Sequence, residues 1–495
     1  MQSTPAQDRE LTLALALVPI VFLVLLLAAS VYLFGADSSY GANQIALALA
    51  AFAAALVGKR IGLPWREVHA GIIEGITVGL GPILILLSVG MLIGTWILSG
   101  TVPAMVYYGV QILDPSIFYM ASALICAIAA LSIGSSWTVA GTLGIGLMGI
   151  ANSFDVSPAV TAGAIISGAY FGDKLSPLSD TTNLAAAATG VDLFDHIRHM
   201  LWTTIPAFVI ALVLFAFLGS SEAATPDEVA ALQLAIAEQF HIGPHLLLPL
   251  AFMLFLVYKR FPAYPSIVAS ALLGAVFALL FQREAVVGLA GDAEGIAALA
   301  KGIWISLFDG YSADSGNTFL DELFSKGGMS SMLNTVWLIL AALGFGGALG
   351  RTGILDYLLK LALKRVNSTF SLVSTTAMTC VGTNVLAADQ FIAVALPGRM
   401  FKQAYEERGL SPLNLSRTLE DSATLTSALI PWNTCGAYMS ATLGVATFTY
   451  APYAFFNYLC VLVAMVYAYL LFSIKPLPSQ DTDAAGDNAP GAAAS

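Results

Sequence analysis

Apolar and polar residues alternate along this chain in long blocks rather than residue by residue. Apolar runs of roughly 17 to 25 residues recur over almost the whole length, as α-helices need to cross a hydrocarbon core about 30 Å thick. The strands of a membrane barrel would be shorter and would alternate in polarity. The pattern therefore predicts an all-α polytopic membrane protein with about 11 to 13 transmembrane helices.

Polar segments interrupt several of these runs in mid-span. The interruptions lie at residues 134–137, 172–183, 382–384 and 420–434, where Gly, Pro, hydroxyl, amide and acidic residues gather. Irregular backbone at membrane depth is tolerated where it is buried in protein or lines a cavity. We therefore expect broken helices and re-entrant hairpins at these places.

The overall composition supports a membrane protein. Of 495 residues, 58% are hydrophobic and only 10% are charged, whereas soluble domains average about 25% charged residues. The first run, Leu11 to Phe34, is too long and continuous for a cleaved signal peptide and predicts a retained span. The net charge of -11 comes largely from loops and the tail, so we expect no nucleic-acid partner.

Basic residues in short loops predict the orientation of the chain. Lys and Arg gather in the 58–69 loop, around residues 399–417 and at Lys475, whereas the turn at 99–103 and the 151–160 segment carry neither. Because basic loops remain on the cytoplasmic side, both termini are expected there. The localisation predicted is the cell (plasma) membrane, with the lipid bilayer as partner.

The two halves of the sequence predict an inverted repeat. Gly134-Ser135-Ser136 aligns with Gly382-Thr383-Asn384, and at the same spacing the uncharged 151–160 segment matches the basic 399–408 loop. Equivalent loops on opposite faces are the mark of two inverted-topology repeats. The expected division is 1–69 N-terminal spans, 70–219 first repeat, 220–300 linker with two spans, 301–475 second repeat and 476–495 disordered cytoplasmic tail.

The stretch from Ser167 to Asn183 places Asp173, Lys174 and Asp180 inside a long apolar region. An ionised group near the bilayer centre costs about 2.5 to 3.5 kcal/mol on insertion scales, so such residues indicate function. Two nearby carboxylates in a low dielectric do not both stay ionised easily, which makes one of them a proton carrier. Competition between a cation and a proton for one carboxylate is sufficient for exchange.

Oxygen-bearing side chains around these carboxylates could complete a shell for an alkali cation. The predicted ion- or proton-binding residues are Asp173, Asp180, Ser176, Ser179, Thr181, Thr182, Asn183, Asp421 and Asn433. The predicted hairpin-tip or substrate residues are Ser135, Ser136, Thr383 and Asn384, and Lys174 is the predicted charge partner of an Asp. A buried structural network joining two helices is the alternative reading of this cluster.

Other reactive side chains give weaker signals. The four cysteines, Cys126, Cys380, Cys435 and Cys460, have no metal-type spacing and are expected to be buried free thiols. His196 and His199 are expected to be solvated or interfacial in a cytoplasmic loop, where they could sense pH. We predict no cofactor and no resident metal; Na+ and H+ are the transported ions.

The motif Gly168-Ala169-Tyr170-Phe171-Gly172-Asp173-Lys174, followed by Ser176-Pro177-Leu178-Ser179-Asp180-Thr181-Thr182-Asn183, resembles the NhaC-type Na+/H+ antiporters. The resemblance continues weakly through Pro431-Trp432-Asn433-Thr434 and covers roughly residues 10–475. It implies membership of a broad ion-transporter superfamily with re-entrant hairpins, inverted repeats and commonly a homodimer. Members include sodium/proton antiporters and carriers of organic acids such as malate and lactate.

Three functions are compatible with these features. The first is Na+/H+ antiport by alternating access, with Asp173 and Asp180 as shared binding groups. The second is an organic-anion exchanger, malate- or lactate-like and coupled to Na+ or H+. The third is an intramembrane aspartyl protease that uses Asp173 and Asp421, which would leave Asp180 and the hydroxyl run without a task. The first two are secondary transporters rather than enzymes.

Overall fold

The computed structural model describes residues 10–34, 38, 40–219, 226–314, 316–364 and 366–477, with side chains for all of these except 226–228 and 319. Within these ranges the ordered elements are helices, joined by loops and by two isolated β-bridges, Tyr311 with Lys326 and Leu410 with Pro476. The predicted all-α fold is confirmed. The tail predicted to be disordered lies outside the described residues from position 478 onward.

The helices of the first part of the chain run from the N-terminal spans to α17. They are α1 (Leu13–Phe34), α2 (Ala42–Arg60), α3 (Trp65–Val78), α4 (Leu80–Leu98), α5 (Thr101–Ile112), α6 (Phe118–Ile133), α7 (Ser136–Val139), η2 (Ala140–Gly144), α8 (Ile145–Ser153), α9 (Pro158–Leu175), α10 (Asp180–Thr189), α11 (Leu193–Leu218), α12 (Pro226–Gln239), η3 (Pro244–Leu247), α13 (Leu248–Tyr258), α14 (Ala263–Phe281), α15 (Arg283–Leu289), α16 (Gly295–Phe308) and α17 (Thr318–Phe324).

The helices of the remaining part carry the second half of the fold. They are η4 (Ser330–Met332), α18 (Leu333–Arg351), α19 (Ile354–Leu363), α20 (Thr369–Ala387), α21 (Gln390–Glu406), α22 (Pro412–Leu419), η5 (Glu420–Thr424), α23 (Leu425–Ser427), α24 (Thr434–Leu443), α25 (Thr447–Tyr450), η6 (Ala451–Tyr453) and α26 (Phe455–Leu470). The segments η2 and η5 are π-helical, and η3, η4 and η6 are 3-10 turns.

Seven helices of the described chain are long and apolar enough to cross a membrane, or up to nine if two bent helix pairs each form one span. The bent pairs join α12 to η3 and α13 at 84°, and α25 and η6 to α26 at 55°. The predicted number of about 11 to 13 spans is larger, because segments such as α6 and α9 are shorter or more polar than a full apolar span.

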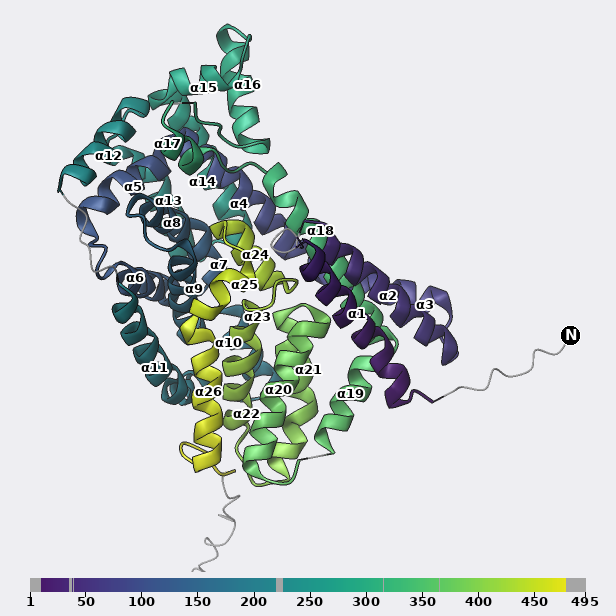
Figure 1. Ribbon diagram of the computed structural model, residues 1–495. Coiled ribbons are helices and arrows are strands. Elements are labelled where there is room, and N and C mark those ends of the chain that lie inside the picture. Colours follow the sequence, from purple (N-terminus) through teal and green to yellow (C-terminus); the bar gives the residue numbers. More distant parts are fainter. Residues whose placement is uncertain are drawn as a thin grey trace, which may run out of the picture.

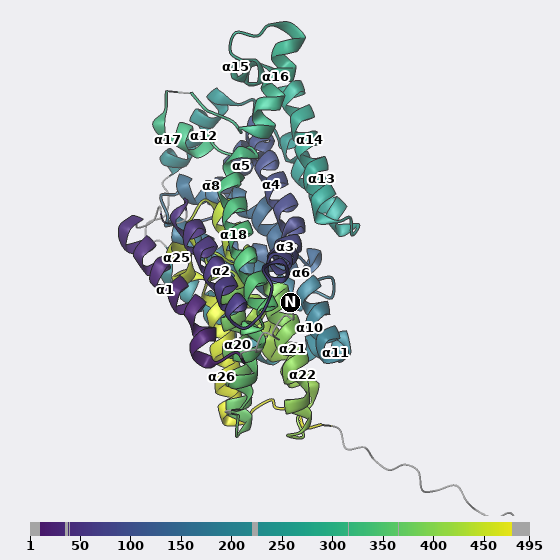
Figure 2. The same ribbon diagram turned by 90° about the vertical axis from the view of Figure 1, so that its right-hand side faces the viewer.

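The helices are grouped into three regions (Figure 1). Along one side, α1, α2 and α3 lie with α18, to which α2 and α3 are packed. At one end, α12 to α17 lie together, and α15 and α16 project from that end in the turned view (Figure 2). The body contains α6, α9, α11 and the helices from α20 to α26, and it holds the polar breaks.

The two halves of the chain contain matching elements. A glycine with positive φ precedes α5 and another precedes α19, at Gly100 (φ 80°) and Gly353 (φ 72°). Likewise α10 ends at Gly190 (φ 76°) and α24 ends at Gly444 (φ 71°), a backbone conformation that glycine adopts without steric cost. In both halves a short helix therefore follows a break and ends in the same way.

The first helices of the two halves run in opposite directions. Arg351, at the end of α18, contacts Glu67, at the start of α3, with Nε to Oε2 at 3.1 Å. Further along, a Cβ at Gly75 would lie 2.4 Å from the Leu343 carbonyl, and one at Gly90 would lie 2.4 Å from the Gly328 carbonyl. Residue numbers thus rise along α3 and α4 while they fall along α18, as antiparallel packing requires.

The last helices of the two halves are also antiparallel. Phe215 near the end of α11 packs on Phe455 at the start of α26, with ring centroids 4.9 Å apart. At the other end, Trp202 packs on Phe472, just beyond α26, with ring centroids 5.7 Å apart. The helices α11 and α26 therefore pack with opposite directions.

Candidate functional site

The central break separates α9 from α10 and is held by side chains from its own residues. Thr182 donates its hydroxyl to the Lys174 carbonyl at 3.0 Å, which ties α10 back to the end of α9. Asn183 donates its amide to the carbonyls of Pro177 at 2.9 Å and Ser179 at 2.8 Å. Two of the predicted binding residues, Thr182 and Asn183, therefore stabilise the interrupted backbone. The buried Ser176 does so too, because its hydroxyl accepts from the Leu178 N–H at 3.3 Å.

Asp173 lies in the last turn of α9 and faces the first hairpin tip. Its Oδ2 accepts hydrogen bonds from the Ser136 backbone N–H at 2.9 Å and from the Ser136 hydroxyl at 2.7 Å. Ser135 caps α7 by accepting from the Thr138 N–H at 3.2 Å. The sequence prediction that Ser135 and Ser136 form a hairpin tip beside Asp173 matches this arrangement.

Small residues bring α9 close enough to α6 for these bonds. A Cβ added at Gly168 would lie 2.0 Å from the Ala123 carbonyl oxygen, and one at Gly172 would lie 2.2 Å from that of Ala127. Close approach of two helix backbones is the usual role of glycine at membrane helix interfaces. The position of Asp173 opposite Ser136 therefore depends on the glycines of the same motif.

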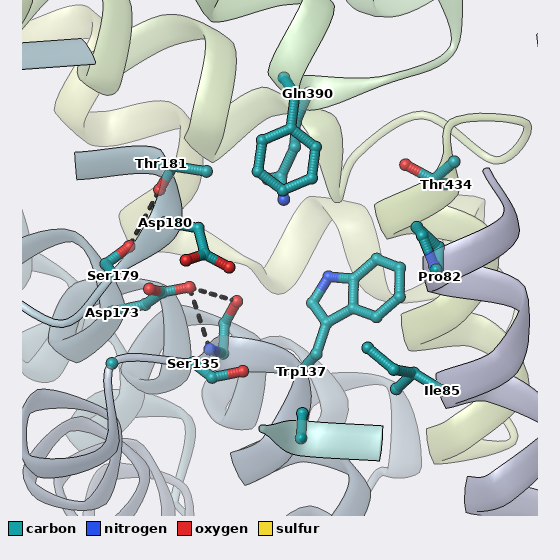
Figure 3. A pocket seen from close by; sticks show the side chains of 15 residues that line it. Pro82, Ile85, Ser135, Trp137, Asp173, Ser179, Asp180, Thr181, Gln390 and Thr434 are labelled. Carbon is teal, nitrogen blue, oxygen red and sulfur yellow. Dashed lines mark hydrogen bonds between the residues drawn. The ribbon is translucent and has the colours of Figure 1, made fainter. Parts of the chain in front are cut away.

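A pocket of about 230 Å³ opens between this break and the second half of the chain. Figure 3 shows Asp173 and Asp180 side by side, with Ser179 and Thr181 next to them. The hydroxyls of Ser179 and Thr181 lie 3.1 Å apart. The lining residues are Gly81, Pro82, Ile85, Gly134, Ser135, Ser136, Trp137, Asp173, Ser179, Asp180, Thr181, Ala263, Gln390, Phe391 and Thr434.

The pocket combines groups that suit a small hard cation. Two carboxylates and several hydroxyl oxygens converge there, and oxygen is the ligand type that such cations prefer. Asp173 is 8% exposed, whereas Asp180 is exposed at the start of α10. Trp137 closes one side, with its ring stacked on Tyr438 at a centroid distance of 4.0 Å.

Lys174 belongs to a second cluster, next to Asp173 in sequence but away from the pocket lining. Its ammonium forms an ion pair with the Asp421 Oδ1 and lies 3.2 Å from the Cys460 sulfur. The Thr203 hydroxyl donates to the same Asp421 oxygen at 3.1 Å. Lys174 and Asp421 are 0% and 1% exposed. Asp421, predicted as an ion-binding residue, is placed here and not in the pocket.

The second hairpin tip differs from its predicted place. Thr383 and Asn384 lie inside α20, where the Thr383 hydroxyl donates to the Thr379 carbonyl at 2.8 Å. The turn falls at Ala388, which has a positive φ of 58°, six positions beyond Gly382. The structural partner of Gly134 is therefore Ala388, because each is the left-handed residue that ends the first arm of a hairpin.

Asn433 joins the second break to the second hairpin. Its side-chain nitrogen donates to the Asn384 carbonyl at 3.2 Å and to the Asn384 Oδ1 at 3.1 Å. Its own Oδ1 caps α24 through the Cys435 N–H at 3.0 Å. The following residue, Thr434, donates its N–H to the Ala388 carbonyl at 3.0 Å and lines the pocket. Asn433 itself braces the pocket without being one of its lining residues.

Several further residues lie at or near the site. Gln390 lines the pocket just after the second turn, next to the buried Asp389 that precedes α21. Glu420 is 0% exposed. His196 and His199, expected in a solvated loop, are 0% and 1% exposed on α11, because this helix begins at Leu193 and packs against α22.

Carboxylates and hydroxyls gathered at broken helices inside a polytopic helical protein define a membrane transporter rather than an enzyme. The chain belongs to the Na+/H+ antiporter family, whose sequence profile matches residues 168–472.

Several known antiporters are similar to this chain over almost their full length. The Na(+)/H(+) antiporter NhaC of Alkalihalophilus pseudofirmus is 38% identical over 86% of this chain and 90% of its own. The malate-2H(+)/Na(+)-lactate antiporter of Bacillus subtilis is 36% identical over 91% and 92%. The arginine/ornithine antiporter ArcD of Halobacterium salinarum is 36% identical over 91% and 90%.

Proposed function

We propose that this protein exchanges Na+ for H+ across the membrane at the pocket formed by Asp173 and Asp180. The supporting observation is the convergence of these two carboxylates with hydroxyls of both a broken helix and a hairpin tip. A cation and a proton compete for the same carboxylate. Either one neutralises its negative charge, and the neutralised group then attracts the other ion much less. No cofactor takes part; Na+ and H+ are the substrates.

The pocket draws residues from both halves of the chain. Asp173 and Asp180 come from the first half, whereas Gln390 and Thr434 come from the second. We propose that the halves are inverted repeats, 70–219 and 301–475, with N-terminal spans 1–69 and a linker 220–300. Movement of the broken helices would then open the pocket to each side in turn, which is alternating access.

The charge pattern supports a proposed orientation of the protein in the membrane. We propose a plasma-membrane homodimer with both termini in the cytoplasm. The basic residues of the 58–69 loop and of the turn after α21 support this orientation, because such residues stay on the cytoplasmic side. The homodimer rests on family resemblance.

Proteoliposomes with an internal pH dye test the exchange. The unsubstituted protein is expected to move protons when an Na+ gradient is applied, and parallel Li+ and K+ gradients give the cation preference. The Asp173→Asn and Asp180→Asn variants should lose this response by about tenfold or more, because an amide carries no charge to attract the cation. Asp155→Asn, at an exposed loop position, is the matched control. Full sodium-induced proton movement in both pocket variants would exclude the proposal.

An organic-acid or amino-acid exchanger is the second candidate, favoured by the names of two relatives, a malate/lactate and an arginine/ornithine antiporter. Against it, neither Arg nor Lys is found among the described residues that line the pocket, so a carboxylate substrate would lack a matching charge. Uptake of radiolabelled malate, lactate or arginine by the same vesicles separates the two functions. The protease alternative is set aside, because Asp173 and Asp421 belong to separate clusters.

A further inference from the structure

Glu420 is a buried carboxyl group that has no role in the exchange proposed at the pocket. It begins the π-helical segment η5 and is 0% exposed. Neither of its carboxyl oxygens accepts a hydrogen bond of ordinary geometry from the described residues, and the hydroxyl of Thr424 is the polar neighbour that its own segment supplies. A buried, ionised carboxylate without partners is very costly, so a group in this setting holds a proton.

The charges around Glu420 lead to the same conclusion. Those that face it are Lys174 and Asp173, from α9, and its neighbour Asp421. Lys174 is already paired with Asp421, and Asp173 adds a further negative charge on the same side. An ionised Glu420 would therefore be a surplus anion in a site that water does not reach.

The titratable groups of α22, α11 and α26, which also pack on η5, are directed to partners other than Glu420. From α22, Arg417 directs its Nη1 to the Ser473 carbonyl at 3.0 Å and acts on Asp421. From α11, the buried His196 faces Lys174. From α26, Cys460 contacts both members of the ion pair.

We propose that Glu420 carries a second proton in each transport cycle, distinct from the one exchanged at Asp173 and Asp180. A cation bound in the pocket neutralises Asp173, which removes one of the negative charges that face Glu420. The buried site then tolerates a carboxylate, and Glu420 releases its proton. When the cation leaves, the negative charge of Asp173 returns and Glu420 takes a proton again. This inference rests on the proposed Na+/H+ exchange and adds a proton to it.

Polar residues of α11 lie between the Lys174–Asp421 pair and Lys475. Thr203 contacts Asp421, and His199 lies one helical turn earlier with its Nε2 at 3.3 Å from the Asn414 Oδ1. Asn414 in turn donates to the Lys475 carbonyl at 2.7 Å. These groups form a line of buried donors and acceptors from the Lys174–Asp421 pair outward.

Proton release on Na+ binding, measured with a pH dye in weakly buffered detergent solution, tests the proposal without transport. Glu420→Gln is expected to release about half as many protons per bound Na+ as the unsubstituted protein, because one of two carriers is gone. In vesicles, its H+ to Na+ ratio should fall by one proton per Na+. Glu406→Gln, at an exposed position of α21, is the matched control. Unchanged proton release and an unchanged ratio in Glu420→Gln would overturn the proposal.

A second measurement separates this inference from the proposed function. Infrared difference spectra between the Na+-free and the Na+-bound protein should show carboxylic acid bands that Na+ removes, and one of these bands should be missing in Glu420→Gln. If Na+ releases no proton from the unsubstituted protein, the exchange itself fails. If release and exchange occur but Glu420→Gln shows the same carboxylic acid bands as the unsubstituted protein, Glu420 is not a protonated group and only the further inference fails.

Discussion

Asp173 and Lys174 are adjacent in sequence but serve two different polar clusters. Consecutive residues of an α-helix point about 100° apart, so one side chain reaches the hairpin at Ser136 and the next reaches Asp421. The sequence could identify both residues, because charges inside an apolar run are rare. It could not identify the partner of Lys174, which lies 247 positions away and depends on how η5 packs against α9.

The ion pair predicts a strongly non-additive pair of substitutions. Lys174→Met should lower the free energy of unfolding by about 3 to 5 kcal/mol, because it leaves the charge of Asp421 buried and unpaired. The double variant Lys174→Met/Asp421→Asn should recover most of this loss, since no buried charge remains. Denaturation of the purified protein, followed by its unfolding midpoint, measures both.

The surface pair between Arg351 and Glu67 provides the comparison. Its side chains are 42% and 40% exposed, so Glu67→Gln is expected to cost less than about 1 kcal/mol. If Lys174→Met lowered the free energy of unfolding as little as Glu67→Gln, the buried Lys174–Asp421 pair would contribute no more to stability than a solvated ion pair.

At the scale of elements, the sequence identified the breaks but placed one hairpin tip too early. Gly382-Thr383-Asn384 resembles a loop because glycine and polar residues favour turns, yet the helix continues there to Ala387. Asp389 marks the true turn, because its Oδ1 accepts from the Ile392 N–H at 3.0 Å and caps α21. The sequence therefore contained a helix start signal at Asp389, but the glycine and polar residues at 382–384 led to a turn being predicted there instead.

The packing of α9 on α6 predicts the effect of one added methyl group. Gly172→Ala should separate the helices, since its Cβ would lie 2.2 Å from the Ala127 carbonyl oxygen. Overpacking of this kind costs about 1 to 3 kcal/mol, and here it also moves Asp173 away from Ser136. We expect weaker Na+ binding as well as a lower melting temperature.

Gly382→Ala is the matched control for this substitution. A Cβ at Gly382 meets no atom within 4 Å in the described structure, and the residue lies in the middle of α20. Alanine there should leave binding unchanged and stabilise the helix by about 0.5 to 1 kcal/mol. Equal losses at the two glycines would show that contact between α9 and α6 does not position the site.

At the scale of the whole molecule, hydropathy and charge predicted the fold class and suggested the inversion. They could not give the number of spans, because some segments that cross the membrane are bent helix pairs or short helices rather than single long apolar helices. The proposed repeat rests on the contrast of uncharged and basic loops, and its residue alignment places the second hairpin tip six positions before the turn at Ala388. A misalignment of six residues does not change the comparison of loop charges, because charge is counted over a whole loop. The position of a hairpin tip, in contrast, is set by single residues such as Ala388.

The inversion predicts that equivalent loops of the two halves face opposite sides of the membrane. Asp155 lies between α8 and α9, and Arg408 lies at the matching position between α21 and α22; both are exposed. In intact cells, a membrane-impermeant thiol reagent should label Asp155→Cys but not Arg408→Cys, and permeabilised cells should show labelling of both. The four native cysteines are buried, so the background should be low. Labelling of both variants, or of neither, in intact cells would place the two loops on the same side and exclude an inverted repeat.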